Sequence, residues 1–377
     1  MNYCSVFKCW AVFMTVLWLV AGVSSAGAKL PDYYVASEST FPSVNPGSSV
    51  RLIVSSDALG DRLTVDVWFP PTYSASASGG FPVVYAHDGQ NLFDPSLSFA
   101  TVAWELDNTA ARLAARGEIQ TPIIVGIHNR GAKNLRPNDY FPEKAIQYIS
   151  ETDKSLIWST CAAGFYGDEY AAFIAAELKP LIDNLYNTNS DRKHTFTMGS
   201  SMGGLASLYL LCEYPEVFGG AACLSTHWIG SFKMNPDYSL QPDPVCARAL
   251  LDYMAACLPD PEGRKLYLDQ GTTGWDADYI GYEAEARAIA GNHGYSVDNG
   301  TLMTYDAIGA GHNEWFWQQR VDKPLKFLLD KQTGGVAEIE TETSDADGFY
   351  YDLQGRRITG RPERGIYIRD GVKTLVK

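Results

Sequence analysis

A serine flanked by glycines lies at the junction of two contrasting segments near the middle of the chain. Residues 195–198, Thr-Phe-Thr-Met, are typical of a buried β-strand, and residues 205–211 have the composition of a helix. Between them, Gly199-Ser200-Ser201-Met202-Gly203 matches the pattern Gly-x-Ser-x-Gly. Glycines at both ends remove the Cβ atoms that would collide in a sharp strand-to-helix turn. The pattern predicts that Ser201 stands in a strained turn at the start of a helix, where backbone N–H groups favour negative charge.

Strand-like and helix-like segments alternate along most of the chain. The expected strands are residues 63–69, 81–86, 122–127, 195–198, 219–225, 265–269 and 302–305, and the expected helices are residues 102–116, 168–186, 205–211, 244–257, 278–290 and 314–329. This alternation predicts an α/β fold with a mostly parallel central sheet and helices on both faces. Residues 128–160 are polar and contain proline, so we expect a surface excursion near the site.

The N-terminal segment has the features of a secretory signal peptide. Lys8 gives a positive flank to an almost wholly apolar run over residues 9–23, which is shorter than the roughly 20 residues of a membrane-spanning helix. Small residues follow, and cleavage after Ala28 would remove a signal peptide of residues 1–28. Cleavage after Ala26 and retention as an N-terminal anchor are the alternatives. We therefore expect a secreted, periplasmic or cell-surface protein with no membrane span once the signal is removed.

Charge and cysteine content restrict the partners of this chain. A formal net charge of −14 over 377 residues disfavours nucleic acid, because phosphate binding needs a basic face. Loss of Cys4 and Cys9 with the signal leaves five of the seven cysteines, whose spacing matches no metal-binding pattern. We therefore expect no metal and no cofactor. An exported chain allows one disulfide among Cys161, Cys246 and Cys257, but the sequence selects neither the pair nor an oligomeric state.

The composition changes after Asp330. Residues 331–348 are rich in Gly, Thr, Glu and Asp and have no apolar period, which is typical of a solvated linker. Residues 349–377 contain short apolar runs separated by glycine-containing turns, which predicts a few β-strands in a tail too short to be stable unaided. The predicted organisation is a signal peptide, an α/β domain over residues 29–330, a linker and a small β-rich tail.

Ser201 needs a base, because a serine hydroxyl is a poor nucleophile at neutral pH, and the base needs an orienting acid. Behind a serine turn of this kind the chain order is Ser, then Asp or Glu, then His, each after a later strand. His312 directly follows the last expected strand, between glycines that let its loop reach the serine. His293 ends a helix, and His227 precedes every acid candidate. His312 is therefore the predicted base.

The orienting acid is expected after the strand that ends near Leu268. Asp276 follows a Gly- and Thr-rich stretch that we read as a loop, from which a carboxylate can reach a histidine, and it is our predicted acid. Asp269, which ends the strand, and Asp278, which resembles the N-cap of the next helix, are the alternatives.

An oxyanion that forms on a carbonyl needs backbone N–H donors. The N–H of Met202, directly after the serine, is the first predicted donor, and the N–H of Gln90, in the loop after the strand 81–86, is the second. We expect His87 and Asp88 to hold this loop by hydrogen bonds rather than to bind a metal.

Taken together, the motifs resemble the Putative esterase family of α/β-hydrolases, which includes feruloyl and acetyl-xylan esterases, enterochelin esterases and mycolyltransferases. The matching segments are residues 87–93, 178–183, 199–204, 269–272, 276, 309–314 and 324–325, and the similarity covers roughly residues 50–330. The resemblance implies an α/β-hydrolase fold, a catalytic triad of Ser201, Asp276 and His312, and an oxyanion hole made by the N–H groups of Gln90 and Met202.

The resemblance has two weaker parts. Trp228 and Trp275 loosely match positions near the family's acyl or sugar pocket, and packing is their alternative role. The tail resembles the C-terminal sorting domain of proteins exported by the type IX system, although it is shorter than a full example. A simple β-rich appendage is the alternative for the tail.

The function expected from these residues and this resemblance is that of a secreted serine carboxylesterase. Its substrates would be acyl or feruloyl esters on plant polysaccharide. An acyltransferase or a siderophore-type esterase with the same triad, and a binding module on a hydrolase fold, are the alternatives.

Overall fold

The computed structural model describes residues 30–38, 46–151, 153–154, 164–231, 233–237 and 239–331, together with three C-terminal strands. The predicted signal peptide and Cys161 lie outside the described residues, so signal cleavage and any disulfide to Cys161 stay predictions. The chain divides after Lys331 into two units.

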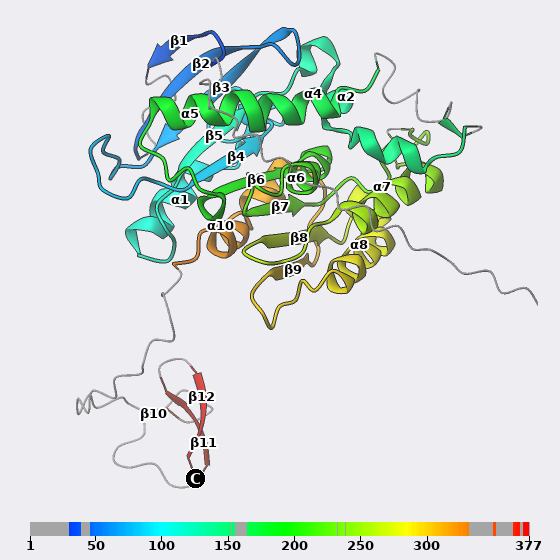
Figure 1. Cartoon of the computed structure of the whole chain (residues 1–377). Coiled ribbons are helices and arrows are strands. Elements are labelled where there is room, and N and C mark those ends of the chain that lie inside the picture. The colour runs from blue at the N-terminus through cyan, green and yellow to red at the C-terminus, as the bar shows by residue number, and fades with distance from the viewer. Residues whose placement is uncertain are drawn as a thin grey trace, which may run out of the picture. The chain divides into compact units, whose positions relative to one another are not determined.

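A nine-stranded sheet forms the centre of the described part of the first unit (Figure 1), in the order β1-β2-β3-β5-β4-β6-β7-β8-β9. The strands are β1 Tyr33–Glu38, β2 Ser48–Ser56, β3 Asp61–Phe69, β4 Val83–His87, β5 Ile123–Ile127, β6 Thr195–Ser200, β7 Gly220–Leu224, β8 Lys265–Gly271 and β9 Leu302–Ala307. The pairs β1–β2, β2–β3 and β3–β5 are antiparallel, and every later pair is parallel. The predicted α/β fold with a mostly parallel sheet is thus confirmed.

Helices cover both faces of this sheet. They are α1 Leu106–Ala115, α2 Arg136–Tyr140, α4 Gly167–Ala172, α5 Lys179–Leu185, α6 Met202–Glu213, α7 Pro244–Cys257, α8 Trp275–Asn292, α9 Glu314–Gln318 and α10 Asp322–Leu328. One buried cluster joins the sheet to α4–α8, and Leu205 and Leu250 belong to it. A second cluster joins the opposite face to α1 and α10 through Leu113 and Leu325. Because β4 to β7 are buried on both faces, their sequences are nearly continuous apolar or small-residue runs.

Several predicted boundaries were wrong, each for a local reason. The helix expected over residues 102–116 begins at Leu106, since Glu105 has a left-handed φ of 50°. The helix expected from Asp278 begins at Trp275. Gly274, at the N-cap, has φ of 59° and turns the chain so that the helix can begin at the next residue. Residues 128–160 are not a surface excursion throughout, since Tyr140 and Phe141 in this segment are fully buried against the core.

The helix predicted over residues 168–186 has three parts. Between α4 and α5, residues Phe173–Leu178 form a π-helical segment. The helix nevertheless keeps one face on the sheet, where Ile174, Leu178 and Ile182 are buried.

The described residues of the second unit form three short strands, β10 Tyr350–Tyr351, β11 Gly365–Arg369 and β12 Val372–Val376. They pair in antiparallel fashion in the order β10-β11-β12. These strands lie where the sequence predicted a β-rich tail, and a role in sorting stays a prediction.

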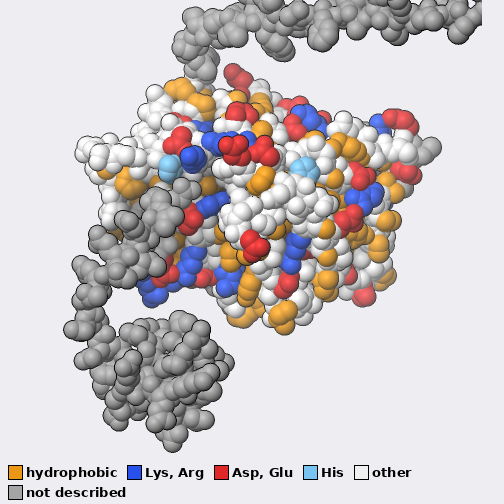
Figure 2. Space-filling model, turned by 60° about the horizontal axis from the view of Figure 1, so that its bottom comes forward, with side chains coloured by type: hydrophobic (Ala, Val, Ile, Leu, Met, Phe, Trp, Pro, Cys, Tyr) orange, Lys and Arg blue, Asp and Glu red, His pale blue; other side chains and the backbone are white. Residues whose placement is uncertain are grey.

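The surface of the first unit carries mixed charge. On the face that Figure 2 draws, Lys and Arg side chains are interspersed with Asp and Glu. None of the helices in the described ranges combines the length and the hydropathy that crossing a bilayer requires.

Candidate active site

A cavity of about 810 Å³ opens at the carboxyl edge of the parallel strands. Its wall comes from segments that follow β4, β5, β6, β8 and β9, and it is lined by Asp88, Gln90, Asn91, Leu97, Phe99, Ala100, His128, Asn129, Gly131, Ala132, Arg136, Ser200, Ser201, Trp275, His312, Asn313, Glu314 and Trp317. Carboxyl ends of parallel strands meet at one edge of a sheet, where α/β proteins place their ligands. Residues that are far apart in sequence therefore come together here.

Ser201 lies in the sharp turn between β6 and α6. Its backbone adopts φ of 57° and ψ of −125°, a strained conformation for a residue with a side chain. The turn needs glycine at position 199, because a Cβ there would lie 2.7 Å from the carbonyl carbon of Gly203, whereas a Cβ on Gly203 would meet the Cβ of His87 at 3.3 Å. Ser201 is only 6% exposed, yet it lines the cavity. Met202 is the first residue of α6, and the first N–H groups of a helix have no partner within the helix.

His312 lines the same cavity as Ser201 and forms a hydrogen bond with Asp276. The imidazole Nδ1 lies 2.5 Å from Asp276 Oδ1. The ring of His312 packs among the rings of Trp275, Tyr279 and Trp317, whose centroids lie 5.0–5.5 Å away. These contacts fix the orientation of the imidazole and direct its other nitrogen away from Asp276.

The sequence suggested a loop at Asp276, but this residue lies in the first turn of α8. Its second oxygen, Oδ2, accepts hydrogen bonds of 2.6 Å from the Gly271 N–H and from the Ser225 hydroxyl. Burial would raise the pKa of this carboxyl, but the hydrogen bonds from His312, Ser225 and Gly271 outweigh burial and lower it. Asp276 is therefore an ionised acceptor at neutral pH.

Neither alternative acid pairs with His312 in this arrangement. Asp269 accepts two 3.0 Å hydrogen bonds from Arg320, at Oδ1 and Oδ2, and one from the Tyr267 hydroxyl. Asp278 is exposed on α8, and Gly274 rather than Asp278 occupies the N-cap position.

The two other downstream histidines lie elsewhere. His227 is fully buried, with Nδ1 2.6 Å from the Tyr279 hydroxyl and Nε2 3.0 Å from the carbonyl oxygen of Ser231. Burial lowers the pKa of His227 to about 3. His293 lies 3.0 Å, through Nε2, from the carbonyl oxygen of Ala255.

The two tryptophans proposed as pocket residues differ in position. Trp275 lines the cavity beside His312. Trp228 is fully buried and does not line the cavity, and its indole N–H donates to Glu283 Oε2 at 2.7 Å. Its position corresponds to the alternative role, packing.

The loop after β4, which carries Gln90, is held by buried polar contacts. Asp88 has a left-handed φ of 56° and accepts two 2.7 Å hydrogen bonds from Arg136. The Asn129 amide donates to Asp88 Oδ1, and the backbone N–H of Asn129 donates to Gln90 Oε1 at 3.2 Å. Asp88 thus anchors the loop, as expected.

His87 lies beneath the same loop. Its Nδ1 lies 3.0 Å from the Tyr170 hydroxyl and its Nε2 lies 3.3 Å from the Thr197 hydroxyl. Burial lowers the pKa of His87 to about 4, so the ring is neutral at pH 7. Within the described residues, no group of three or more His, Cys, Asp or Glu side chains is placed to hold a metal ion.

Sequence reasoning missed several residues around the cavity. Arg136 escaped notice because its segment read as a surface excursion. Ser225 and Arg320 support Asp276 through contacts that no local motif encodes. The position of Ser225 as the last residue of the strand expected over residues 219–225 was the one available signal.

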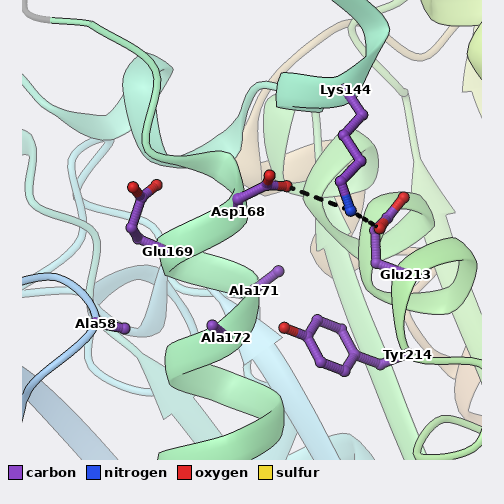
Figure 3. A pocket seen from close by; sticks show the side chains of 8 residues that line it. All are labelled: Ala58, Lys144, Asp168, Glu169, Ala171, Ala172, Glu213 and Tyr214. Atoms are coloured by element: carbon purple, nitrogen blue, oxygen red, sulfur yellow. Dashed lines mark hydrogen bonds and ion pairs between the residues drawn. The ribbon is translucent and has the colours of Figure 1, made fainter.

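A second pocket, of about 350 Å³, lies near α4 and α6. Figure 3 shows the Lys144 side chain between Asp168 and Glu213, with which it forms ion pairs. None of the predicted catalytic residues lines this pocket. The larger cavity is therefore the candidate active site.

Curated relatives match part of the chain. Ferri-bacillibactin esterase BesA of Bacillus subtilis (strain 168) is 27% identical over 190 residues, which are 48% of this chain and 60% of that protein. The uncharacterised protein YbbA of the same organism is 27% identical over 163 residues, which are 43% of this chain and 56% of that protein. The chain thus spans less than two-thirds of the length of these relatives.

Solved structures show the same fold. A ferulic acid esterase superposes with a TM-score of 0.54 at 19% identity, covering 76% of this chain and 98% of that one. The enterobactin esterase FES from Shigella flexneri gives a TM-score of 0.53 at 16% identity, covering 74% of this chain and 58% of that one.

The family comparison covers more of the chain. Residues 56–326 match the family described as Putative esterase, and this region includes the cavity and its paired His312 and Asp276. Because the match extends over more than half of the chain, the protein belongs to the Putative esterase family of α/β-hydrolases.

Proposed function

We propose that this protein is a serine carboxylesterase in which Ser201 is the nucleophile, His312 the general base and Asp276 the acid that orients the base. The observation that carries the proposal is that His312, hydrogen-bonded to Asp276 at 2.5 Å, lines the same cavity as a serine in a strained turn. Because Asp276 accepts from Nδ1, the neutral imidazole carries its proton there and leaves Nε2 able to accept a proton.

The reaction has two halves. Ser201 Oγ attacks the ester carbonyl carbon and its proton passes to Nε2 of His312. The resulting oxyanion is stabilised by the N–H groups of Met202 and Gln90, and the departing alcohol takes the proton from His312. Water then attacks the acyl-enzyme by the same steps and releases the carboxylic acid.

The charges in the cavity favour a neutral ester. Among the described residues that line it, Arg136 is the single Lys or Arg, and its guanidinium is already paired with Asp88. Glu314 adds a further carboxyl, whose pKa is raised by burial. Acyl or feruloyl esters of plant polysaccharide suit such a cavity, and a ferulic acid esterase has the same fold.

A siderophore ester is the second candidate, because BesA is a ferri-bacillibactin esterase by name. Iron-bound catecholates are anionic, and a cavity with one paired cation and an additional carboxyl disfavours them. A comparison of kcat/KM for methyl ferulate and for a ferric catecholate lactone distinguishes the two. We expect the neutral ester to be preferred.

The class of reaction is tested with p-nitrophenyl acetate. We expect the wild-type protein to hydrolyse it, and Ser201→Ala to lose on the order of 10³-fold or more in kcat/KM. Ser207→Ala is the matched control, because Ser207 is a buried serine on α6, the helix that follows Ser201, and its hydroxyl donates to the Gly203 carbonyl. Inactive wild-type protein, or a fully active Ser201→Ala variant, would overturn the proposal.

A further inference from the structure

We infer that Ser225 is a positioning residue for the active site: its hydroxyl holds Asp276 in place and sets how strongly Asp276 supports His312. The inference rests on the proposed function and concerns a residue that no catalytic motif includes. Arg320 acts behind Ser225, as the cation that orders its hydroxyl.

Hydrogen bonds fix the backbone of Ser225 at the carboxyl end of β7, an interior strand of the sheet. Ser225 directly follows β7, is fully buried and has a left-handed φ of 41°. A conformation of this kind persists in a residue with a Cβ only where its surroundings enforce it. Here the Ser225 N–H donates to the Asp269 carbonyl oxygen at 2.8 Å and to Asp269 Oδ1 at 3.0 Å.

The contacts of the Ser225 hydroxyl determine where its proton lies. Its oxygen is 3.1 Å from Nε1 of Trp317 and 2.7 Å from Nη2 of Arg320. Indole and guanidinium nitrogens only donate, so they occupy the two acceptor sites of the hydroxyl. The remaining contact, 2.6 Å to Asp276 Oδ2, must therefore be the one in which Ser225 donates.

Arg320 makes this donor stronger. The guanidinium is 3% exposed and forms two hydrogen bonds with Asp269, so its charge is held in place beside Ser225. A hydroxyl that accepts from a cation becomes more polarised and donates more strongly.

The hydrogen bond from Ser225 determines how the two oxygens of Asp276 are occupied. Ser225 and the Gly271 N–H occupy Oδ2, which leaves Oδ1 to His312. Removing one donor from Oδ2 leaves more negative charge on the carboxylate and strengthens its attraction for a protonated imidazole.

Other charged and titratable groups also face this pair. Those facing His312 and Asp276 are His227, Tyr279, Glu314 and Arg320. Loss of the Ser225 hydroxyl removes one acceptor from Arg320, but the two hydrogen bonds to Asp269 still hold that guanidinium in place. All four charged or titratable groups are kept, so a shift in the titration would report the lost hydrogen bond.

The first experiment is the pH profile of kcat/KM for p-nitrophenyl acetate in wild type and Ser225→Ala. We expect the acid limb of Ser225→Ala to move to higher pH by about half to one unit, less than the full size of one hydrogen bond to a charged group, because the effect reaches the imidazole through Asp276. Ser225→Cys, which fills the same space with a weaker donor, should move it less. Ser207→Ala should leave it in place, since the hydroxyl of that serine donates to the Gly203 carbonyl and not to Asp276.

The second measurement does not depend on turnover. NMR titration of the imidazole, assigned by its absence in His312→Gln, should show the same upward movement of the midpoint in Ser225→Ala. A folded Ser225→Ala protein whose imidazole titrates like wild type would overturn the inference. If the midpoint moves but no ester is hydrolysed, the positioning role stands and the proposed function fails.

Discussion

At the scale of single residues, the site depends on which donor each carboxylate oxygen of Asp276 accepts a hydrogen bond from. Asp276 is fully buried, and both of its oxygens are occupied by donors. The donor on Oδ1 is a histidine and the donors on Oδ2 belong to the scaffold. Oδ1 therefore binds the imidazole, whereas Oδ2 holds the carboxylate in position.

Replacing Asp276 by Asn tests this division. The Ser225 hydroxyl and the Gly271 N–H both donate toward Oδ2, so the amide oxygen must occupy that side and the NH₂ group must face His312. Nδ1 would then accept, and the proton would move to the nitrogen that should act as base. We expect kcat to fall on the order of 10³- to 10⁴-fold, measured with p-nitrophenyl acetate.

The matched control is Asp278→Asn, which makes the same change on an exposed residue of the same helix. Its kcat should stay within a factor of about two of wild type, since surface changes have small effects. A large loss in this control, or more than a tenth of wild-type kcat in Asp276→Asn, would contradict the assignment.

At the residue scale, chain order was the constraint that the sequence offered, and the structure places the two residues selected with it, His312 and Asp276, in hydrogen-bond contact. His312 and Asp276 were selected because each follows a strand whose carboxyl end meets the same edge of the sheet. Ser225 and Arg136 could not be selected in this way, because their importance comes from partners that only the folded chain brings near.

At the scale of elements, the turn between β6 and α6 depends on space. A Cβ on Gly199 would lie 2.7 Å from carbonyl atoms of Gly203, closer than side-chain carbons approach backbone. The first glycine of the Gly-x-Ser-x-Gly pattern is thus a packing requirement of the turn itself.

Gly199→Ala should therefore destabilise the protein. We expect the free energy of unfolding to fall by about 1–3 kcal/mol, as for other overpacked sites, and kcat to fall with it as Ser201 is displaced. Urea unfolding and ester hydrolysis measure the two effects.

Gly281→Ala is the control for Gly199→Ala. Gly281 lies in α8, and a Cβ there would have no neighbour within 4 Å. Because alanine favours a helix over glycine, this change should raise the free energy of unfolding by about 0.5–1 kcal/mol. Equal destabilisation by both changes would show that the crowding at Gly199 has no special effect.

Element boundaries were less predictable than element order. The alternation of apolar runs predicted the sheet, but the start of α8 depends on the backbone of Gly274 and the start of α1 on that of Glu105. Left-handed residues of this kind leave no periodic signal.

At the scale of the whole molecule, two neutral histidines are buried in the fold. Burial lowers the pKa of His87 to about 4 and that of His227 to about 3, whereas an unfolded histidine titrates near 6.5. Below pH 6.5 the unfolded chain therefore binds protons that the folded chain does not.

Stability should accordingly fall as the pH drops from about 6.5 toward 4. Near pH 5 each of the two histidines contributes a slope of about 1.4 kcal/mol per pH unit to the free energy of unfolding. Urea unfolding at several pH values measures the slope. His227→Gln should reduce the slope by the contribution of one histidine, about 1.4 kcal/mol per pH unit. An unchanged slope in this variant would contradict a neutral buried His227.

The π-helical segment between α4 and α5 has a consequence for comparing this chain with its relatives. Tyr170, Ile174, Leu178 and Ile182 follow one another at intervals of four, and all are buried. In a regular α-helix each such step rotates by about 40°, so the last of the four would point well away from the sheet. The wider π turn takes up this rotation. A homologue that has lost one residue here could continue as a regular α-helix and keep the same face on the sheet, because 11 α-helical residues turn by about 1100°, within about 20° of three full turns. A one-residue alignment gap at this place would therefore mark the loss of the π turn and not a repacked core.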